Sequence, residues 1–138
     1  MSATRRTFRP TGVIVVMWAT VAVLLVLVGV VGTRLPEGYG FSTSQTATIF
    51  ALIGFVALSA LAVTLSRVTA DEDGLTFVNG FRKRRLRWDD IAVVSMRPGA
   101  PWPTVVTTDD RRFILFGIQG SEGASAREAV AWIVRHLP

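Results

Sequence analysis

One short segment of the chain holds most of its concentrated charge, and the chemistry that it suggests is the binding of anions. Five of the six residues between Phe81 and Trp88 are basic: Arg82, Lys83, Arg84, Arg85 and Arg87. Alternate side chains of a strand point in opposite directions. One face would therefore hold Lys83, Arg85 and Arg87, and the other Arg82, Arg84 and Leu86. Because both faces carry arginine, we expect an exposed edge strand or hairpin arm that binds anionic lipid headgroups.

Two other interpretations of this basic segment stay open. Charged residues on a sheet edge discourage aggregation, so the segment is also explained as a solvated, protective edge. A protein partner is the third interpretation. Nucleic acid is disfavoured as a partner, because residues 67–138 hold eleven basic and nine acidic residues, a net charge of +2, without a row of aromatic residues for base stacking.

The residue types that most often perform catalysis or bind metals are scarce. The chain has no cysteine and one histidine, His136, placed where a polar group complements the dipole of a helix end. Its acidic clusters adjoin turn signals, where Asp favours local hydrogen bonds; they are Asp71-Glu72-Asp73, Asp89-Asp90 and Asp109-Asp110. Because this set lacks a nucleophile with a base, a phosphate loop and the usual zinc ligands, we predict no enzyme activity, no metal and no cofactor.

Two long apolar runs determine where the basic segment lies. No charged residue occurs between Arg9 and Arg34, or from Phe41 to Ser66. About 20 apolar residues cross a hydrocarbon core ~30 Å thick. We therefore predict transmembrane helices at residues 11–33 and 46–66.

The distribution of basic residues predicts how these helices are oriented. Three basic residues precede the first run and six lie soon after the second, against one in the loop between them. Basic residues stay on the cytoplasmic side of such helices. We expect a multi-pass protein of the inner or plasma membrane with both termini in the cytoplasm. Residues 1–10 would form a disordered basic tail, residues 34–45 an external loop, and residues 67–138 a cytoplasmic domain.

The beginning of the chain has a second interpretation. The sequence Thr4-Arg5-Arg6-Thr7-Phe8 is similar to the front of a twin-arginine export signal. However, the apolar run after it is longer than a usual signal core, lacks an A-x-A cleavage site and is followed by a second run. A retained membrane anchor is therefore favoured.

Small residues recur in both apolar runs and would permit close helix packing. They are Gly29 and Gly32 in the first run, and Ala47, Ala51 and Gly54 in the second. The expectation is that the two helices pack on each other, with the alternative that small residues are simply frequent in such helices.

The residues after Arg67 change to short strands separated by turns. The candidate strands are residues 68–70, 75–78, 81–88, 91–96, 104–108 and 112–116. Asn79-Gly80 and Asp109-Asp110 predict hairpin turns. Helical spacing of apolar residues from Ala126 predicts a C-terminal amphipathic helix, with Ser125 and Glu128 as a capping box. The predicted class is α+β: a two-helix transmembrane hairpin, then a small antiparallel sheet or partial barrel capped by the C-terminal helix.

A set of short motifs supports this layout. They are Asp-Gly-Leu-Thr-Phe at 73–77, Asn79-Gly80, the basic segment, Trp-Asp-Asp-Ile at 88–91 and Pro101-Trp102. Together, over about residues 66–138 and behind two apolar runs, they resemble the bacterial pleckstrin-homology-like (PH) domains of small actinobacterial membrane proteins. This resemblance implies a curved, partly open barrel of antiparallel strands with a C-terminal helix, and it implies little about a ligand.

Position along the chain favours lipid as the partner of the basic segment. Fifteen residues separate Arg82 from the end of the second apolar run, which keeps the segment near the inner leaflet. A basic residue there is worth about 1 kcal/mol against anionic lipid. Trp102 is a further candidate lipid-binding residue, or else packs over the domain core. We predict a membrane-anchored, non-catalytic binding or scaffold module; the alternative is a protein–protein interaction module of a membrane assembly with no lipid specificity.

Overall fold

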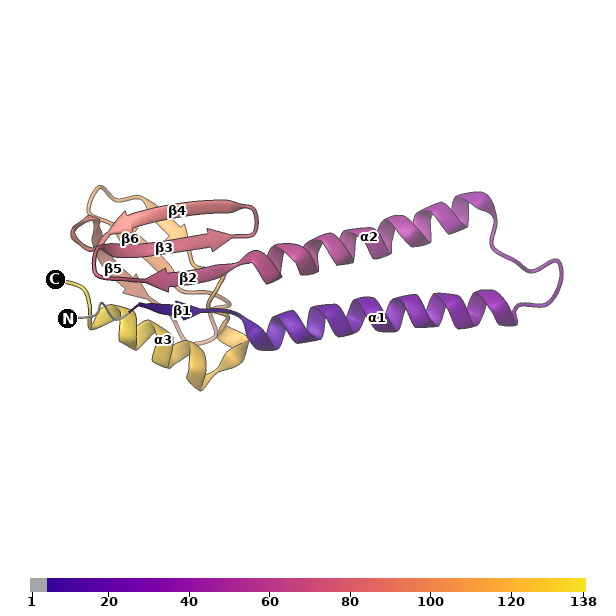
Figure 1. The fold of residues 1–138 in the computed structure, drawn as a ribbon, viewed down its shortest axis with the longest axis horizontal. Helices are drawn as coiled ribbons and strands as arrows, with labels where there is room; N and C mark the ends of the chain where they lie inside the picture. The colour runs from indigo at the N-terminus through magenta and orange to yellow at the C-terminus, as the bar shows by residue number, and fades with distance from the viewer. Residues whose placement is uncertain (1–4) are drawn as a thin grey trace.

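The computed structural model describes residues 5–138, which form two long helices and a small α+β domain (Figure 1). Helix α1 is Thr11–Arg34 and helix α2 is Thr43–Leu65. At 1.5 Å per residue they are about 36 Å and 35 Å long, enough to cross a hydrocarbon core. Their mean hydropathy reaches 2.9 and 2.4. Both helices extend from one end of the domain, and the loop between them lies far from it.

Helix α2 begins three residues before the predicted position because a capping box fixes its start. The Ser42 hydroxyl accepts a hydrogen bond from the Gln45 backbone N–H at 3.2 Å, and the Gln45 side chain accepts one from the Ser42 N–H at 2.9 Å. These two bonds satisfy backbone donors that have no partner inside the helix.

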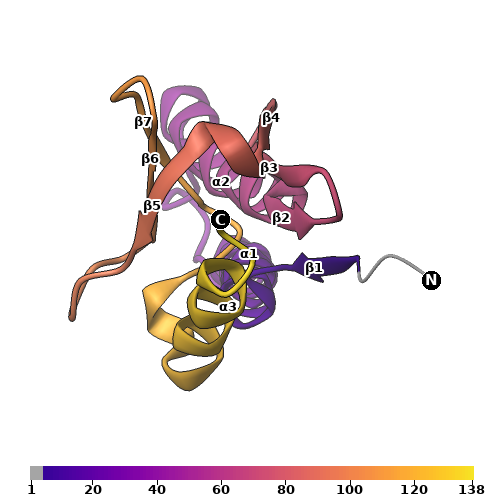
Figure 2. The same ribbon diagram turned by 90° about the vertical axis from the view of Figure 1, so that its left-hand side faces the viewer.

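The domain contains two antiparallel sheets, shown end-on in Figure 2. The first has the order β1-β2-β3-β4, and the second has the order β5-β6-β7. The strands are β1 Arg6–Phe8, β2 Arg67–Ala70, β3 Gly74–Asn79, β4 Arg82–Arg87, β5 Ile91–Ser95, β6 Thr104–Thr107 and β7 Arg112–Ile114. The 3-10 helix η1, Trp88–Asp90, connects the sheets. The α+β class and the six strands after α2 are as predicted, and the sheets are open rather than closed into a barrel.

The segment before α1 differs from its prediction as a disordered tail. Residues 6–8 form β1, which pairs antiparallel with β2 so that Phe8 lies opposite Val68. The hydroxyls of Thr7 and Thr69 lie 3.2 Å apart across this pair. Residues 1–4 of the expected tail lie outside the described residues. The helical hairpin is therefore inserted between two neighbouring strands of one sheet, with only Arg9-Pro10 and Ser66 as connections.

Helix α3, Ala124–Val134, covers the space between the two sheets (Figure 2). It buries four residues, Ala126, Ala129, Trp132 and Ile133, against a core that includes Phe77 and Leu115. The predicted capping box is wrong. Gly123 is the N-cap residue, at φ 59°, and the Arg127 N–H already donates to its carbonyl, so Ser125 lies inside the helix.

The two helices pack on each other as expected, but the glycines of the apolar runs do not form the contact. A Cβ atom placed on Gly29, Gly32 or Gly54 would meet no heavy atom within 4 Å. The helices instead contact each other nearer the domain, where Val21 and Ala60 are buried and Trp18 Nε1 donates to Thr64 Oγ1 at 2.8 Å. They diverge towards the far loop (Figure 1).

Candidate functional site

The turn between β3 and β4 is fixed to the end of α2. The Gly80 N–H donates to Ser66 Oγ at 2.9 Å, and Ser66 Oγ donates to the Ala62 carbonyl at 2.8 Å. Gly80 has φ 64°, a value that suits glycine, and a Cβ added there would lie 3.5 Å from the Ala62 side chain. The turn of this hairpin therefore lies at the depth of the last turn of α2.

The basic side chains are arranged at increasing distance from that turn. Arg82 pairs with Asn79 beside the turn, whereas Arg87 pairs with Gly74 at the other end of the hairpin. At about 3.3 Å per residue, five steps separate these two arginines by roughly 16 Å. The Debye length is about 8 Å at physiological ionic strength. A charged surface at the turn would therefore attract Arg82 much more strongly than Arg87.

Acidic residues neutralise the basic residues that lie farthest from the turn. Arg85 contacts Asp71 at 3.2 Å and Asp73 at 3.8 Å, and Arg87 contacts Asp89 at 3.8 Å. Within residues 5–138, Arg82, Lys83 and Arg84, the three basic residues of the half nearer the turn, form no such ion pair. The charge of the hairpin that has no acidic partner thus lies in the half of β4 nearer α2.

Asp71 organises the far end of the hairpin. Its Oδ1 accepts hydrogen bonds from the N–H groups of Asp73 at 2.9 Å and Gly74 at 3.0 Å, in addition to its contact with Arg85. Burial acts to raise the pKa of Asp71, but the two backbone donors and then Arg85 together hold it below 3.8. Asp71 is therefore a turn residue, as its position in the sequence suggests.

The two faces of β4 are as the alternation predicts. Leu86 is buried opposite Leu75, and the Arg84 guanidinium lies over the Phe113 ring, 4.9 Å from its centroid. The other face, with Lys83, Arg85 and Arg87, is exposed. Since β4 is also an edge strand of its sheet, the predicted edge is confirmed.

Phe81 is a candidate functional residue that the sequence analysis missed. It follows Gly80 at the tip of the turn and keeps 64% of its surface exposed. A large aromatic side chain that is exposed beside a turn attached to the end of α2 matches the pattern of residues at a membrane interface. The signal in the sequence was a large aromatic residue between an Asn-Gly turn and the basic segment.

Trp102 lies at the same end of the domain as the hairpin turn. Its indole N–H donates to Gln119 Oε1 at 2.9 Å, and its ring meets Phe116 edge to face at a centroid distance of 4.8 Å. The Phe116 N–H in turn donates to Asn79 Oδ1 at 3.1 Å. Trp102 is half-buried, so only part of its ring is available at the surface.

The remaining residues considered for chemistry lie apart from this site. The His136 ring stacks on Trp132, with centroids 4.0 Å apart, and its Nδ1 lies 2.8 Å from the Trp132 carbonyl. The Asp109 carboxylate bonds the Thr107 hydroxyl and also Arg111, and these contacts lower its pKa. In residues 5–138 no group of three or more potential metal ligands occurs.

Comparison with known proteins agrees with this architecture. Residues 66–133 match the family model described as the bacterial PH domain. The matched region begins at the last residue before β2, so β1 and both long helices lie before it. Neither the curated proteins nor the solved structures contain a significant match to the chain.

Proposed function

Given that the chain belongs to the bacterial PH domain family through residues 66–133, we propose that it is a membrane-anchored, non-catalytic binding module whose β3–β4 turn contacts anionic lipid. The observation that carries the proposal is the attachment of this turn to α2. Gly80 is hydrogen-bonded to Ser66, one residue beyond the end of the helix. If α2 spans the bilayer, the neighbouring Phe81, Arg82 and Lys83 meet the headgroup region.

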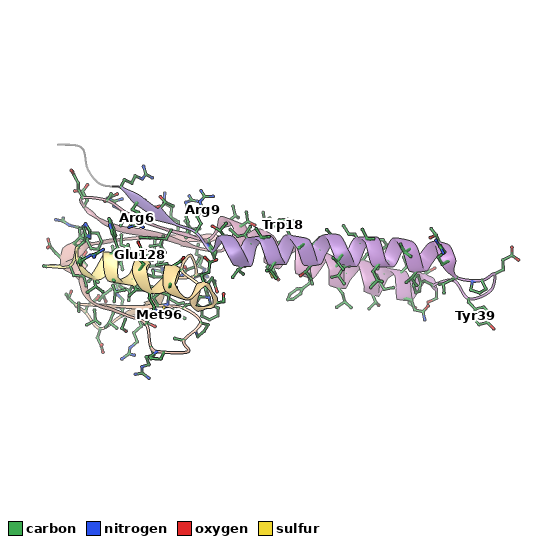
Figure 3. All side chains as sticks on the ribbon, turned by 90° about the horizontal axis from the view of Figure 1, so that it is seen from below. Arg6, Arg9, Trp18, Tyr39, Met96 and Glu128 are labelled. Carbon is green, nitrogen blue, oxygen red and sulfur yellow. The ribbon has the colours of Figure 1, made fainter. Side chains whose placement is uncertain are left out.

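The orientation of the domain also supports this proposal. Strand β1 leads directly into α1 through Arg9-Pro10, and α2 leads directly into β2 through Ser66. Figure 3 shows Arg9 at the junction of the domain and α1, with Tyr39 at the opposite end. Two short connections leave the domain little freedom to turn away, so the same face stays towards the membrane.

Basic residues at this junction support a cytoplasmic location for the domain. Arg9 precedes α1, Arg67 follows α2, and Arg82 and Lys83 lie at the same end of the sheet, with β3 between Lys83 and Arg67. Positive charge of this kind is retained on the cytoplasmic side. Each such residue contributes about 1 kcal/mol against anionic lipid, so the two hairpin residues contribute roughly 2 kcal/mol. Because the helices already hold the protein in the membrane, this energy orients the domain.

A protein partner is the second candidate, and the exposed edge of β4 favours it. An edge strand offers unpaired backbone groups to an added strand, and the exposed arginines of β4 would select an acidic one. This function would use the far half of the hairpin, around Arg85 and Arg87, rather than the turn.

The experiment is hydrogen exchange of the full-length protein in nanodiscs of phosphatidylcholine, with and without phosphatidylglycerol. We expect the amides of residues 79–84 to become more protected when the anionic lipid is present. The variant R82S/K83S should lose that increase. The charge-matched variant R85S/R87S should keep it, because those arginines are distant from α2 and paired with carboxylates.

Two results would reject the lipid function. One is equal protection of residues 79–84 in both kinds of nanodisc. The other is loss of the lipid effect in R85S/R87S but not in R82S/K83S, which would assign the basic segment to another ligand.

A further inference from the structure

A cavity of about 710 Å³ lies at the end of the domain from which α1 and α2 extend. The β5–β6 loop forms one wall, from Met96 to Pro101, and residues 119–121 with the start of α3 form the other. Gly120 holds the two walls together: its N–H donates to the Pro101 carbonyl at 2.7 Å, and a Cβ there would lie 2.2 Å from the Ala100 carbonyl oxygen. The cavity is therefore built by close backbone packing.

The charge of this cavity is wholly positive. Arg97 from the loop and Arg127 from α3 both line it, and no carboxylate is among its lining residues. Neither arginine forms an ion pair within residues 5–138. By contrast, two other cavities that contain arginines also contain carboxylates, Glu122 in one and Glu72, Asp73 and Asp89 in the other. Two unpaired guanidinium groups facing one space are suited to a phosphate.

An apolar groove of about 530 Å³ adjoins this cavity and runs onto α1. Val13, Val16 and Met17 line the groove, and Ser121 lines both the groove and the cavity. The Glu122 carboxylate is at the border, where its Oε1 accepts a hydrogen bond from the Gly12 N–H at 2.7 Å. That bond places it at the N-terminus of α1, whose dipole favours negative charge.

We propose that the cavity and the groove together bind one anionic phospholipid. Its phosphate lies between Arg97 and Arg127, and an acyl chain lies along Val13, Val16 and Met17 of α1. A ligand that is charged at one end and apolar along its length matches a positive cavity that continues into an apolar groove. The inference rests on the proposed membrane location, and it uses residues separate from the β3–β4 turn.

The test is native mass spectrometry of the full-length protein in detergent with added phosphatidylglycerol or phosphatidylcholine. We expect one phosphatidylglycerol to remain bound, in preference to phosphatidylcholine. In R97Q/R127Q the bound fraction should fall roughly tenfold or more, as expected for the loss of charge-assisted hydrogen bonds. The control R112Q/R135Q removes two exposed arginines that do not line the cavity and should bind like the parent protein.

Further measurements distinguish this lipid site from a site for a free anion and from the β3–β4 turn. Millimolar inorganic phosphate should not displace the lipid, and displacement would assign the cavity to a free anion instead. R82S/K83S should keep the bound lipid while losing the protection described above. Parental binding by R97Q/R127Q, or loss of binding in R82S/K83S alone, would overturn the cavity proposal and leave the proposed function standing. An unchanged melting temperature shows that each variant is folded.

Discussion

Phe8, three residues before α1, packs edge to face on Trp132 of α3, with ring centroids 5.8 Å apart. The Arg6 guanidinium lies over both rings and contacts Glu128 at 3.5 Å. Figure 3 shows Arg6 and Glu128 together at the domain. The chain thus contributes a strand and an aromatic contact to the domain before it enters the first helix.

The substitution Phe8→Ala should destabilise the domain although it precedes the family-matched region. Phe8 is half-buried, so losing its packing and its contact with Trp132 should cost about 1–2 kcal/mol. The measurement is thermal unfolding of the full-length protein, followed by tryptophan fluorescence. Tyr39→Ala, at a side chain 75% exposed in the far loop, is the control. Equal melting temperatures for both variants would exclude a structural role for β1.

Replacing residues 10–66 with Asn-Gly should yield a folded domain that needs no membrane. Phe8 pairs with Val68, so Arg9 and Arg67 are next to each other across the strands and suit a two-residue hairpin turn. We expect this protein to unfold cooperatively and at a higher temperature than residues 67–138 alone, which leave β2 as an open edge. The comparison is made by calorimetry. If the shorter protein is equally stable, β1 is dispensable.

The stability of the fold should depend on pH through Asp71. The pKa of Asp71 is lower in the folded protein than its ordinary value of 3.8. Ionised Asp71 therefore stabilises the fold fully when the pH is above its pKa in the unfolded protein, and this stabilisation is lost as the pH falls towards and through its pKa in the folded protein. The full-length protein should lose stability between about pH 5 and pH 3, and Asp71→Asn should lose less over that range. Melting temperatures across the range test this, and parallel curves for the two proteins would contradict it.

The Ser66 hydroxyl should control how firmly the β3–β4 turn is held at the helix. Ser66→Ala removes the acceptor of the Gly80 N–H, a bond worth about 1 kcal/mol. Exchange of the Gly80 amide should accelerate about fivefold. Ser59→Ala is the control, because the only partner of that hydroxyl among residues 5–138 is the Phe55 carbonyl within α2. An unchanged Gly80 rate would mean that other contacts hold the turn.

Local patterns in the sequence were sufficient to predict most of the fold. Asn79-Gly80 predicted the hairpin because its turn requires positive φ, and Gly80 has φ 64°. Apolar spacing from Ala126 predicted helix α3, and Ala126, Ala129 and Ile133 of the predicted face are buried, whereas Val134 is exposed. The start of α3 was misplaced because Ser125 and Glu128 fit a capping pattern, while the chain enters the helix from a 3-10 turn through Gly123.

Local patterns in the sequence did not predict the contacts between segments that are distant along the chain. Arg6–Phe8 is too short to show a strand period, and its partner β2 lies about sixty residues later. The basic segment was found as a set, but its division into free and paired residues depends on Asp71 and Asp73 across the hairpin. Phe81 was missed because the position of the turn beside α2 depends on the contact between Gly80 and Ser66, which no local pattern shows.

The depth of the hairpin in a bilayer tests the central claim most directly. The chain contains no cysteine, so single-cysteine variants at Phe81, Arg84 and Arg87 can each carry one fluorescent label in the full-length protein. In vesicles with phosphatidylglycerol, quenching by labelled lipids should be strongest at position 81, weaker at 84 and weakest at 87. Equal quenching at all three positions, or none at position 81, would contradict a hairpin whose turn contacts the membrane.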